Sequence, residues 1–177
     1  MEILHDFIEV LKYTLPALIV FLTAYFLLTR YMRKDAIEKS LKMKIDRDKE
    51  IIMLRLQAYE RLALFLERIN PASVITRVRT PDMLASELQY AMVRNIREEY
   101  EHNLSQQIYV SSHTWNLIVA SKEEMLKTVN LIGNQMPPEA SAGQFISALL
   151  NGIANANAQL PTEQALDFLK AETKELF

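Results

Sequence analysis

The sequence predicts a mainly α protein with one N-terminal transmembrane helix, a charged helical stalk and a cytoplasmic helical bundle of about four helices. Only 3 of its 177 residues are glycine, and no turn signal lies between alternating strand-like runs. Residues 13–29 carry no charge, and apolar residues recur at helical spacing through most of the remaining chain. Because cysteine is absent, the sequence excludes disulfides and thiolate chemistry.

Residues 1–12 predict a short amphipathic segment. Its apolar residues recur at helical spacing, and acidic side chains occupy the opposite face. This segment would lie in the membrane interface or form the first turn of the span.

Residues 13–29 predict the transmembrane helix. As a helix they span roughly 25 Å, slightly less than the hydrocarbon layer of about 30 Å, and Lys12 and Arg30 would extend this length by snorkelling. The strongly apolar residues would contribute roughly −3 to −5 kcal/mol to insertion. A cleaved signal and a buried core helix are the alternatives. A signal would carry positive charge before the apolar run, whereas here the preceding residues are acidic.

The charges that flank the span predict its orientation. Lys12 precedes it, and Arg30, Arg33 and Lys34 follow it. Since positive charge is retained on the cytoplasmic side, we expect a single-pass protein of the bacterial inner membrane with its N-terminus outside.

Residues 30–69 predict a basic juxtamembrane and stalk helix, because neither proline nor glycine interrupts them. Charges of both signs alternate along the first half, so a coiled coil and a solvated linker remain open. The expected apolar stripe comprises Ile45, Ile52, Leu56, Tyr59, Leu62, Leu66 and Ile69.

Residues 70–177 predict the cytoplasmic helical domain. Asn70-Pro71 would end the stalk helix, and the β-branched run after it would be extended. Thr80-Pro81-Asp82 then predicts a helix start, with a buried face of Leu84, Leu88, Met92 and Ile96 and an end near His102 or Asn103.

Three further helices are expected in this domain: one after Ser111, one in the small-residue segment after Pro137-Pro138, and one at the C-terminal end. Ser111 or Ser112 would cap a helix that ends at Gly133-Asn134. Pro137-Pro138 marks a joint, and a final amphipathic helix would begin at Thr162.

One stretch of the chain has the residue spacing of a metal site. Glu99 and His102 have the Glu-x-x-His spacing of di-iron bundles, but that site needs a second copy, and the charged neighbours favour a solvent-exposed face. The familiar zinc, phosphate-loop and serine-hydrolase motifs are missing from the sequence. We therefore expect no catalytic residue, no metal site, no cofactor and no small-molecule substrate.

Candidate interaction residues are Arg77, Arg79 and Tyr109. The two arginines alternate in a segment expected to be extended, where they would point the same way toward a phosphate or an acidic partner. Because residues 51–177 contain 11 basic and 14 acidic side chains, we expect no nucleic-acid partner.

The anchor, the charged helix containing LRLQAYERLALFLERINP and the helical domain together resemble an uncharacterised bacterial family of small single-pass membrane-anchored proteins. That resemblance implies no known activity. The layout is also similar to the b subunit of rotary ATP synthases, but Pro71, Pro81, Pro137 and Pro138 interrupt what would be one long stalk.

The function expected from the sequence is that of a membrane-tethered, non-enzymatic interaction or scaffold protein. Its expected partners are the lipid bilayer and either another protein or a second copy of the chain. A structural subunit of a larger membrane complex and a metal-dependent helical enzyme are the alternatives.

Overall fold

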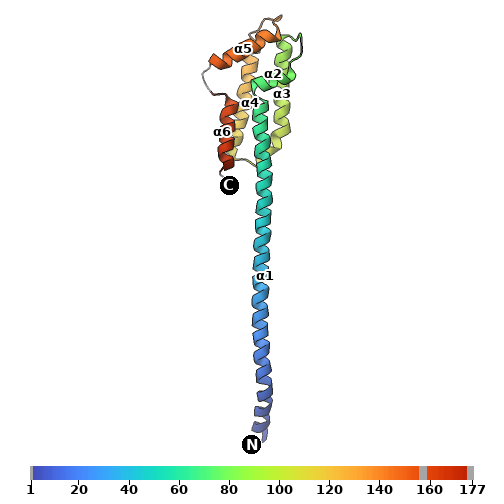
Figure 1. Ribbon diagram of the computed structural model, residues 1–177, viewed down its shortest axis with the longest axis vertical. Coiled ribbons are helices and arrows are strands. Elements are labelled where there is room, and N and C mark those ends of the chain that lie inside the picture. Colours follow the sequence, from blue (N-terminus) through green and yellow to red (C-terminus); the bar gives the residue numbers. More distant parts are fainter. Residues whose placement is uncertain (1, 156–158, 175–177) are drawn as a thin grey trace. The chain divides into compact units, whose positions relative to one another are not determined.

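The computed structural model describes residues 2–155 and 159–174, and their side chains from residue 12 onward. Helices account for 87% of the structure, and the described residues contain no strand, which confirms the mainly α prediction. The elements are α1 (Glu2–Arg68), α2 (Pro71–Val78), α3 (Ala85–Asn103), the 3₁₀ helix η1 (Leu104–Ile108), α4 (Ser112–Gly133), α5 (Ala142–Asn155) and α6 (Pro161–Lys174) (Figure 1).

The chain divides into two compact units, residues 1–50 and 51–177. The N-terminal unit (residues 1–50) consists of the first part of α1, which contains Pro16 without ending there. Its side chains are exposed from Lys12 to Glu50. The amphipathic pattern expected for residues 1–12 depends largely on side chains that lie outside the described ones.

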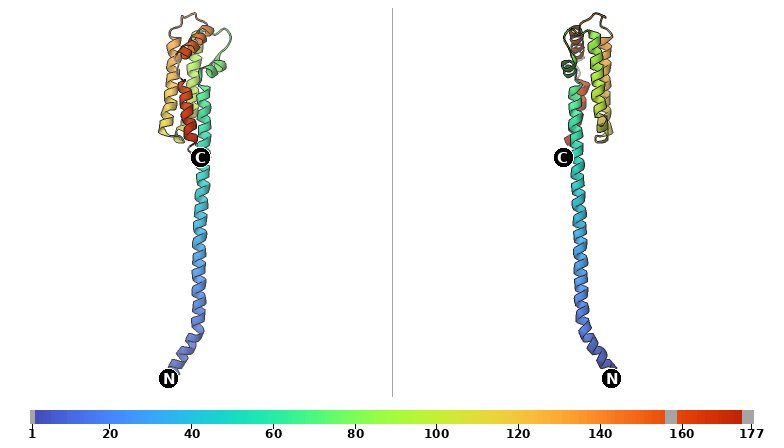
Figure 2. Two further views of the ribbon diagram at one scale, coloured as in Figure 1. Left: turned by 60° about the vertical axis from the view of Figure 1, so that its left-hand side comes forward. Right: turned by 90° about the vertical axis from the view of Figure 1, so that its right-hand side faces the viewer.

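The C-terminal unit (residues 51–177) contains the end of α1 together with α2 to α6. Within it α4 packs against both α3 and α6, and α5 contacts α3 and α4 (Figures 1 and 2). The short helix α2 packs on α3. Each helix of this unit therefore buries one face against its neighbours.

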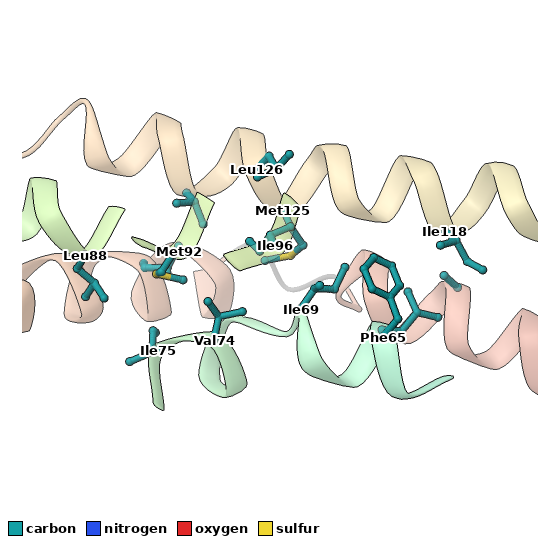
Figure 3. Close-up of a cluster of buried hydrophobic side chains, with 14 of the residues drawn as sticks. Phe65, Ile69, Val74, Ile75, Leu88, Met92, Ile96, Ile118, Met125 and Leu126 are labelled. Atoms are coloured by element: carbon teal, nitrogen blue, oxygen red, sulfur yellow. The ribbon is translucent and has the colours of Figure 1, made fainter. Parts of the chain in front are cut away.

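The core of the C-terminal unit draws apolar side chains from every one of its α-helices. Those from α1 to α4 point toward one another in Figure 3. Burial of this apolar surface contributes most of the stability of the unit, because no disulfide is available. The fully buried members include Leu62, Ile69, Val74, Leu88, Met92, Ile96, Ile118, Val129, Phe145 and Leu149.

The predicted stripe along α1 is buried only toward its C-terminal end. Tyr59, Leu62, Leu66 and Ile69 belong to the core, whereas Ile45 is 47% exposed. The apolar residues have the same helical spacing in both parts. The spacing therefore predicts that they share one side of the helix, but it does not predict that this side is buried.

The expectation of an extended segment after Pro71 was wrong, because residues 71–78 form α2. The side-chain oxygen of Asn70 accepts a hydrogen bond of 3.1 Å from the backbone N–H of Ala72, and Pro71 occupies the first turn. The side chains of Val74 and Ile75 are buried in the core. Their burial on one helical face outweighs the modest β preference of branched residues.

The predicted helix start at Thr80-Pro81-Asp82 was also wrong, since α3 begins at Ala85. Asp82 instead has a positive φ of 60°, which ends any helical path there. The Glu87 carboxylate accepts a hydrogen bond of 2.8 Å from the N–H of Leu84 and so closes the first turn from inside the helix. Leu88, Met92 and Ile96 are buried as predicted, but Leu84 is 42% exposed, so its place on the predicted buried face was wrong.

The other predicted helix ends agree with the structure. The helix α3 ends at Asn103, and α4 ends at Gly133 with Asn134 as its C-cap. At the start of α4, Ser111 Oγ accepts a hydrogen bond of 3.2 Å from the N–H of Thr114. The last helix, α6, begins at Pro161, one residue before the predicted Thr162.

Candidate functional site

The N-terminal unit carries an uncovered apolar surface. In the described part of the chain, α1 is the one helix that contains a stretch long and apolar enough to cross a membrane, with a mean hydropathy of 1.6 over 18 residues. None of that stretch is buried, and Val20 and Phe26 are each 69% exposed. The core helix of a soluble domain would instead bury most of its apolar side chains.

Two threonine hydroxyls of this stretch are hydrogen-bonded within the helix. Thr23 Oγ1 donates a hydrogen bond of 2.7 Å to the carbonyl oxygen of Ile19, and the Thr29 hydroxyl donates to the carbonyl oxygen of Tyr25. The backbone N–H and C=O groups of a helix are hydrogen-bonded within it, and so are these two threonine hydroxyls. A segment in lipid needs such internal hydrogen bonds, because no water is available there.

The four predicted flanking charges bracket this apolar stretch. Lys12 lies before it, and Arg30, Arg33 and Lys34 lie after it, all on the continuous α1 and all exposed. Their long side chains leave the ammonium and guanidinium groups free to reach a polar layer while the stems cover apolar surface.

The C-terminal unit contains a cluster of hydrogen bonds around one carboxylate, that of Glu172 in α6. Its Oε1 accepts from the Tyr59 hydroxyl at 2.6 Å and from the backbone N–H of Ser111 at 2.8 Å. Its Oε2 accepts from the Ser111 hydroxyl at 2.7 Å and from the Thr114 hydroxyl. We call Tyr59, Ser111, Thr114 and Glu172 the carboxylate cluster; it joins α1, α4 and α6.

The carboxylate cluster holds Glu172 ionised. Burial alone raises the pKa of Glu172, but the hydrogen bonds from Thr114, Tyr59 and Ser111 outweigh that effect and lower its pKa from 4.5 to about 2. Burial and the bond to Glu172 raise the pKa of Tyr59 above its ordinary value of 10. Both groups therefore keep the protonation states that this hydrogen bond needs across the physiological range.

Arg55 extends the carboxylate cluster to the loop before α4. Its Nη2 donates to the Tyr59 hydroxyl at 3.1 Å, and its Nε donates to the backbone carbonyl of Tyr109 at 3.2 Å. Tyr109, a predicted interaction residue, thus contributes its main chain to an internal contact. The arrangement links α1 to the loop before α4 and, through Tyr59, to Glu172 of α6.

Sequence reasoning missed Glu172, Tyr59 and Arg55 as partners. The Ser111 cap was visible in the sequence, but nothing local connects it to a glutamate in a helix that follows 61 residues later. Only the packing of α6 on α4 brings the carboxylate to the cap.

The two predicted interaction arginines do not share one direction. Arg77 lies in α2 and donates hydrogen bonds of 2.7 Å to the carbonyl oxygen of Arg68 and to Oδ1 of Asn95, whereas Arg79 is the C-cap residue. The alternation expected of an extended segment fails because this segment is helical, and positions two apart on a helix face different ways.

Glu99 is engaged by Arg68 and is not a free metal ligand. Arg68 Nε donates to Glu99 Oε1 at 2.8 Å, and the Glu99 side chain is only 14% exposed. The expectation that this stretch is uniformly solvent-exposed is therefore wrong at Glu99. Among the described residues no group of three or more His, Asp or Glu side chains is arranged to hold a metal ion.

A surface groove of about 840 Å³ runs along α3 beside the loop that precedes it. Tyr90 lines it and is 69% exposed, and Arg94 Nε pairs with Glu98 Oε1 at 2.7 Å on the same helix. The groove thus combines an exposed aromatic ring with charges of both signs.

Comparison with protein families identifies the family to which the chain is similar. A model described as "Family of unknown function (DUF7935)" matches residues 5–176, which is nearly the whole chain. Neither the curated proteins nor the solved structures include a match.

Proposed function

The chain belongs to the DUF7935 family, whose function is unknown, and we propose that it is a membrane-tethered, non-enzymatic interaction or scaffold protein. Residues 13–29 would anchor it in the bacterial inner membrane. The helical domain would stand in the cytoplasm and bind a protein partner.

The exposed apolar stretch of α1 carries this proposal. Its side chains are uncovered, the hydroxyls of Thr23 and Thr29 are bonded within the helix, and basic residues follow it. Exposed to water, so large an apolar surface would favour aggregation, whereas a bilayer would cover it. The excess of positive charge after the stretch supports a cytoplasmic C-terminal unit.

The groove along α3 supports the interaction role. Tyr90 is exposed, and tyrosine is enriched among the residues that contribute most to binding energy at protein interfaces. The carboxylate cluster supports a non-enzymatic role, because its hydroxyls are occupied by Glu172 and serve packing.

Membrane partition tests the anchor. We expect the tagged chain in the membrane fraction, resistant to carbonate extraction, and Ile19→Lys combined with Leu22→Lys should move it to the soluble fraction. The matched control, Ile37→Lys, lies outside the span and should leave the chain in the membrane. Recovery of the unaltered chain in the soluble fraction would refute the anchor.

Protease accessibility tests the orientation. Protease added to spheroplasts should leave the C-terminal unit intact and should digest it only after lysis. Digestion from the periplasmic side would reverse the proposed topology.

A photo-crosslinking amino acid at Tyr90 tests the docking role. We expect a discrete crosslinked protein there and none at Glu101, an exposed control on α3. Stoichiometric co-purification with several membrane subunits would instead favour a structural subunit of a larger complex.

A further inference from the structure

The part of α1 between residues 30 and 50 leaves a second apolar face uncovered. It is helical without interruption (Figure 1). Its apolar side chains are well exposed, with Ile37 at 61% and Leu41 at 57%. These residues follow Arg30, Arg33 and Lys34, so lipid that covers residues 13–29 does not reach them. Another protein surface is needed to cover them.

We propose that the face is covered by the same face of a second copy of the chain, as a parallel, in-register pair of α1 helices. The proposal rests on the proposed function, because two copies anchored in one membrane with the same orientation necessarily run parallel. Confinement to one membrane also raises the effective concentration of each copy for the other. A short contact is then sufficient, although it would be too small for free association in solution.

The spacing of the face fits a coiled-coil seam. Ile37, Leu41, Lys44 and Asp48 follow one another at intervals of 4, 3 and 4 residues, which places them on one side of the helix. In a parallel pair each of these residues faces its own counterpart and the neighbouring seam residues of the other helix.

The two charged members of the seam complement each other between copies. Lys44 faces Lys44 and Asp48 faces Asp48 across the seam, but each lysine also lies beside Asp48 of the other helix, so two reciprocal ion pairs offset the like-charge repulsion. Within the described chain Lys39 pairs with Asp35 at 2.9 Å, whereas Lys44 and Asp48 have no ion-pair partner of their own. They are therefore free to pair across the seam.

A flanking pair adds to this complementarity. Arg33 and Glu38 are five residues apart, which is the separation of the positions that exchange salt bridges between parallel helices. Both are exposed and have no ion-pair partner in the described chain. The seam thus has apolar contacts at Ile37 and Leu41. Opposite charges follow them at Lys44 and Asp48, and Arg33 and Glu38 flank them.

Single cysteines test the pairing directly, because the natural chain has none. The probe is the full chain in native membranes, oxidised and then separated without reductant. Leu41→Cys on the seam should give a disulfide-linked dimer several-fold more efficiently than Lys39→Cys, which lies on the opposite side of the helix. Equal crosslinking at both positions, or none at Leu41→Cys, would overturn the proposal.

Charge reversal tests the register in the Leu41→Cys background. Asp48→Lys and Lys44→Asp should each lower the dimer yield several-fold, and the double exchange should restore it. If single reversals leave the yield unchanged, or the double exchange does not restore it, the proposed seam is wrong.

The membrane fraction of every sample is measured in the same experiment. A chain that stays in the membrane but does not crosslink would refute the pairing and leave the anchor intact. A chain recovered in the soluble fraction would refute the anchor, and with it the shared membrane on which the pairing depends.

Discussion

Tyr59 donates a hydrogen bond of 2.6 Å to Oε1 of Glu172, although the two residues are 113 positions apart in the chain. The same carboxylate accepts from the N–H and hydroxyl of Ser111 and from the hydroxyl of Thr114. One anion therefore joins the end of α1, the start of α4 and the last turn of α6. The stability of the C-terminal unit should depend on it more than on any exposed charge.

Glu172→Gln should destabilise the C-terminal unit by about 2 kcal/mol, because charge-assisted hydrogen bonds from three residues are weakened at once. Chemical denaturation of the purified chain in detergent measures the change. Trp115, the single tryptophan, stacks on Tyr100 at a centroid distance of 5.8 Å and reports the transition by fluorescence.

Glu101→Gln is the matched control, since Glu101 is an exposed residue of α3. It should change the free energy of unfolding by no more than about 0.5 kcal/mol. Equal effects of the two substitutions would show that the carboxylate cluster adds nothing to stability.

The same carboxylate predicts a loss of stability in acid. The unfolded chain takes up a proton on Glu172 near pH 4.5, whereas the folded chain, with a pKa of about 2, resists protonation until lower pH. The stabilisation is therefore complete above pH 4.5 and declines as the pH falls toward 2. Unfolding free energy measured from pH 6 to pH 3 should fall more steeply for the natural chain than for Glu172→Gln; parallel curves would contradict the assignment.

Thr162→Val should stabilise the C-terminal unit by about 1 kcal/mol. Thr162 is 2% exposed, and its hydroxyl has no hydrogen-bond partner, so a methyl group of similar size removes an unsatisfied polar atom. Thr114 is equally buried but donates to Glu172, so Thr114→Val should destabilise. Denaturation midpoints that move in the same direction for both variants would refute this distinction.

Phe145→Ala should cost roughly 3 to 5 kcal/mol, because Phe145 is fully buried where α5 meets the core. Leu150→Ala on the same helix should cost far less, since Leu150 is 44% exposed. Thermal unfolding followed by circular dichroism distinguishes the two. Similar losses would mean that α5 presents a different face to its neighbours.

The elements that the sequence predicted well are those with local signals. Ser111 caps α4 with its own side chain, and Gly133 with Asn134 ends it. These signals act within one helical turn, so they are readable without knowledge of the rest of the fold.

The errors arose where distant contacts override local preference. Thr80-Pro81-Asp82 has the composition of a helix start, yet α3 begins at Ala85, whose N–H donates a hydrogen bond of 2.8 Å to the carbonyl oxygen of Ala140. Ala140 precedes α5, so the residues around Ala85 do not indicate that the two pair. The β-branched residues after Pro71 form a helix for the same reason, since Val74 and Ile75 find buried places there.

The carboxylate cluster could not be predicted from the sequence, for a related reason. Glu172 is one of 22 acidic residues, and neither its spacing nor its neighbours distinguish it. Its role depends on the packing of α6 against α4. The apolar character of residues 13–29, by contrast, is a property of composition and was readable at once.

The distance in sequence between Tyr59 and Glu172 also sets an order of events during synthesis. At about 5 to 20 residues per second, Tyr59 is made roughly 6 to 23 seconds before its carboxylate partner. In that interval the buried face of α1 has no α6 to cover it, although residues 13–29 are already complete. In the nascent chain the buried face of α1 therefore stays exposed, and the carboxylate cluster stays incomplete, until Glu172 leaves the ribosome.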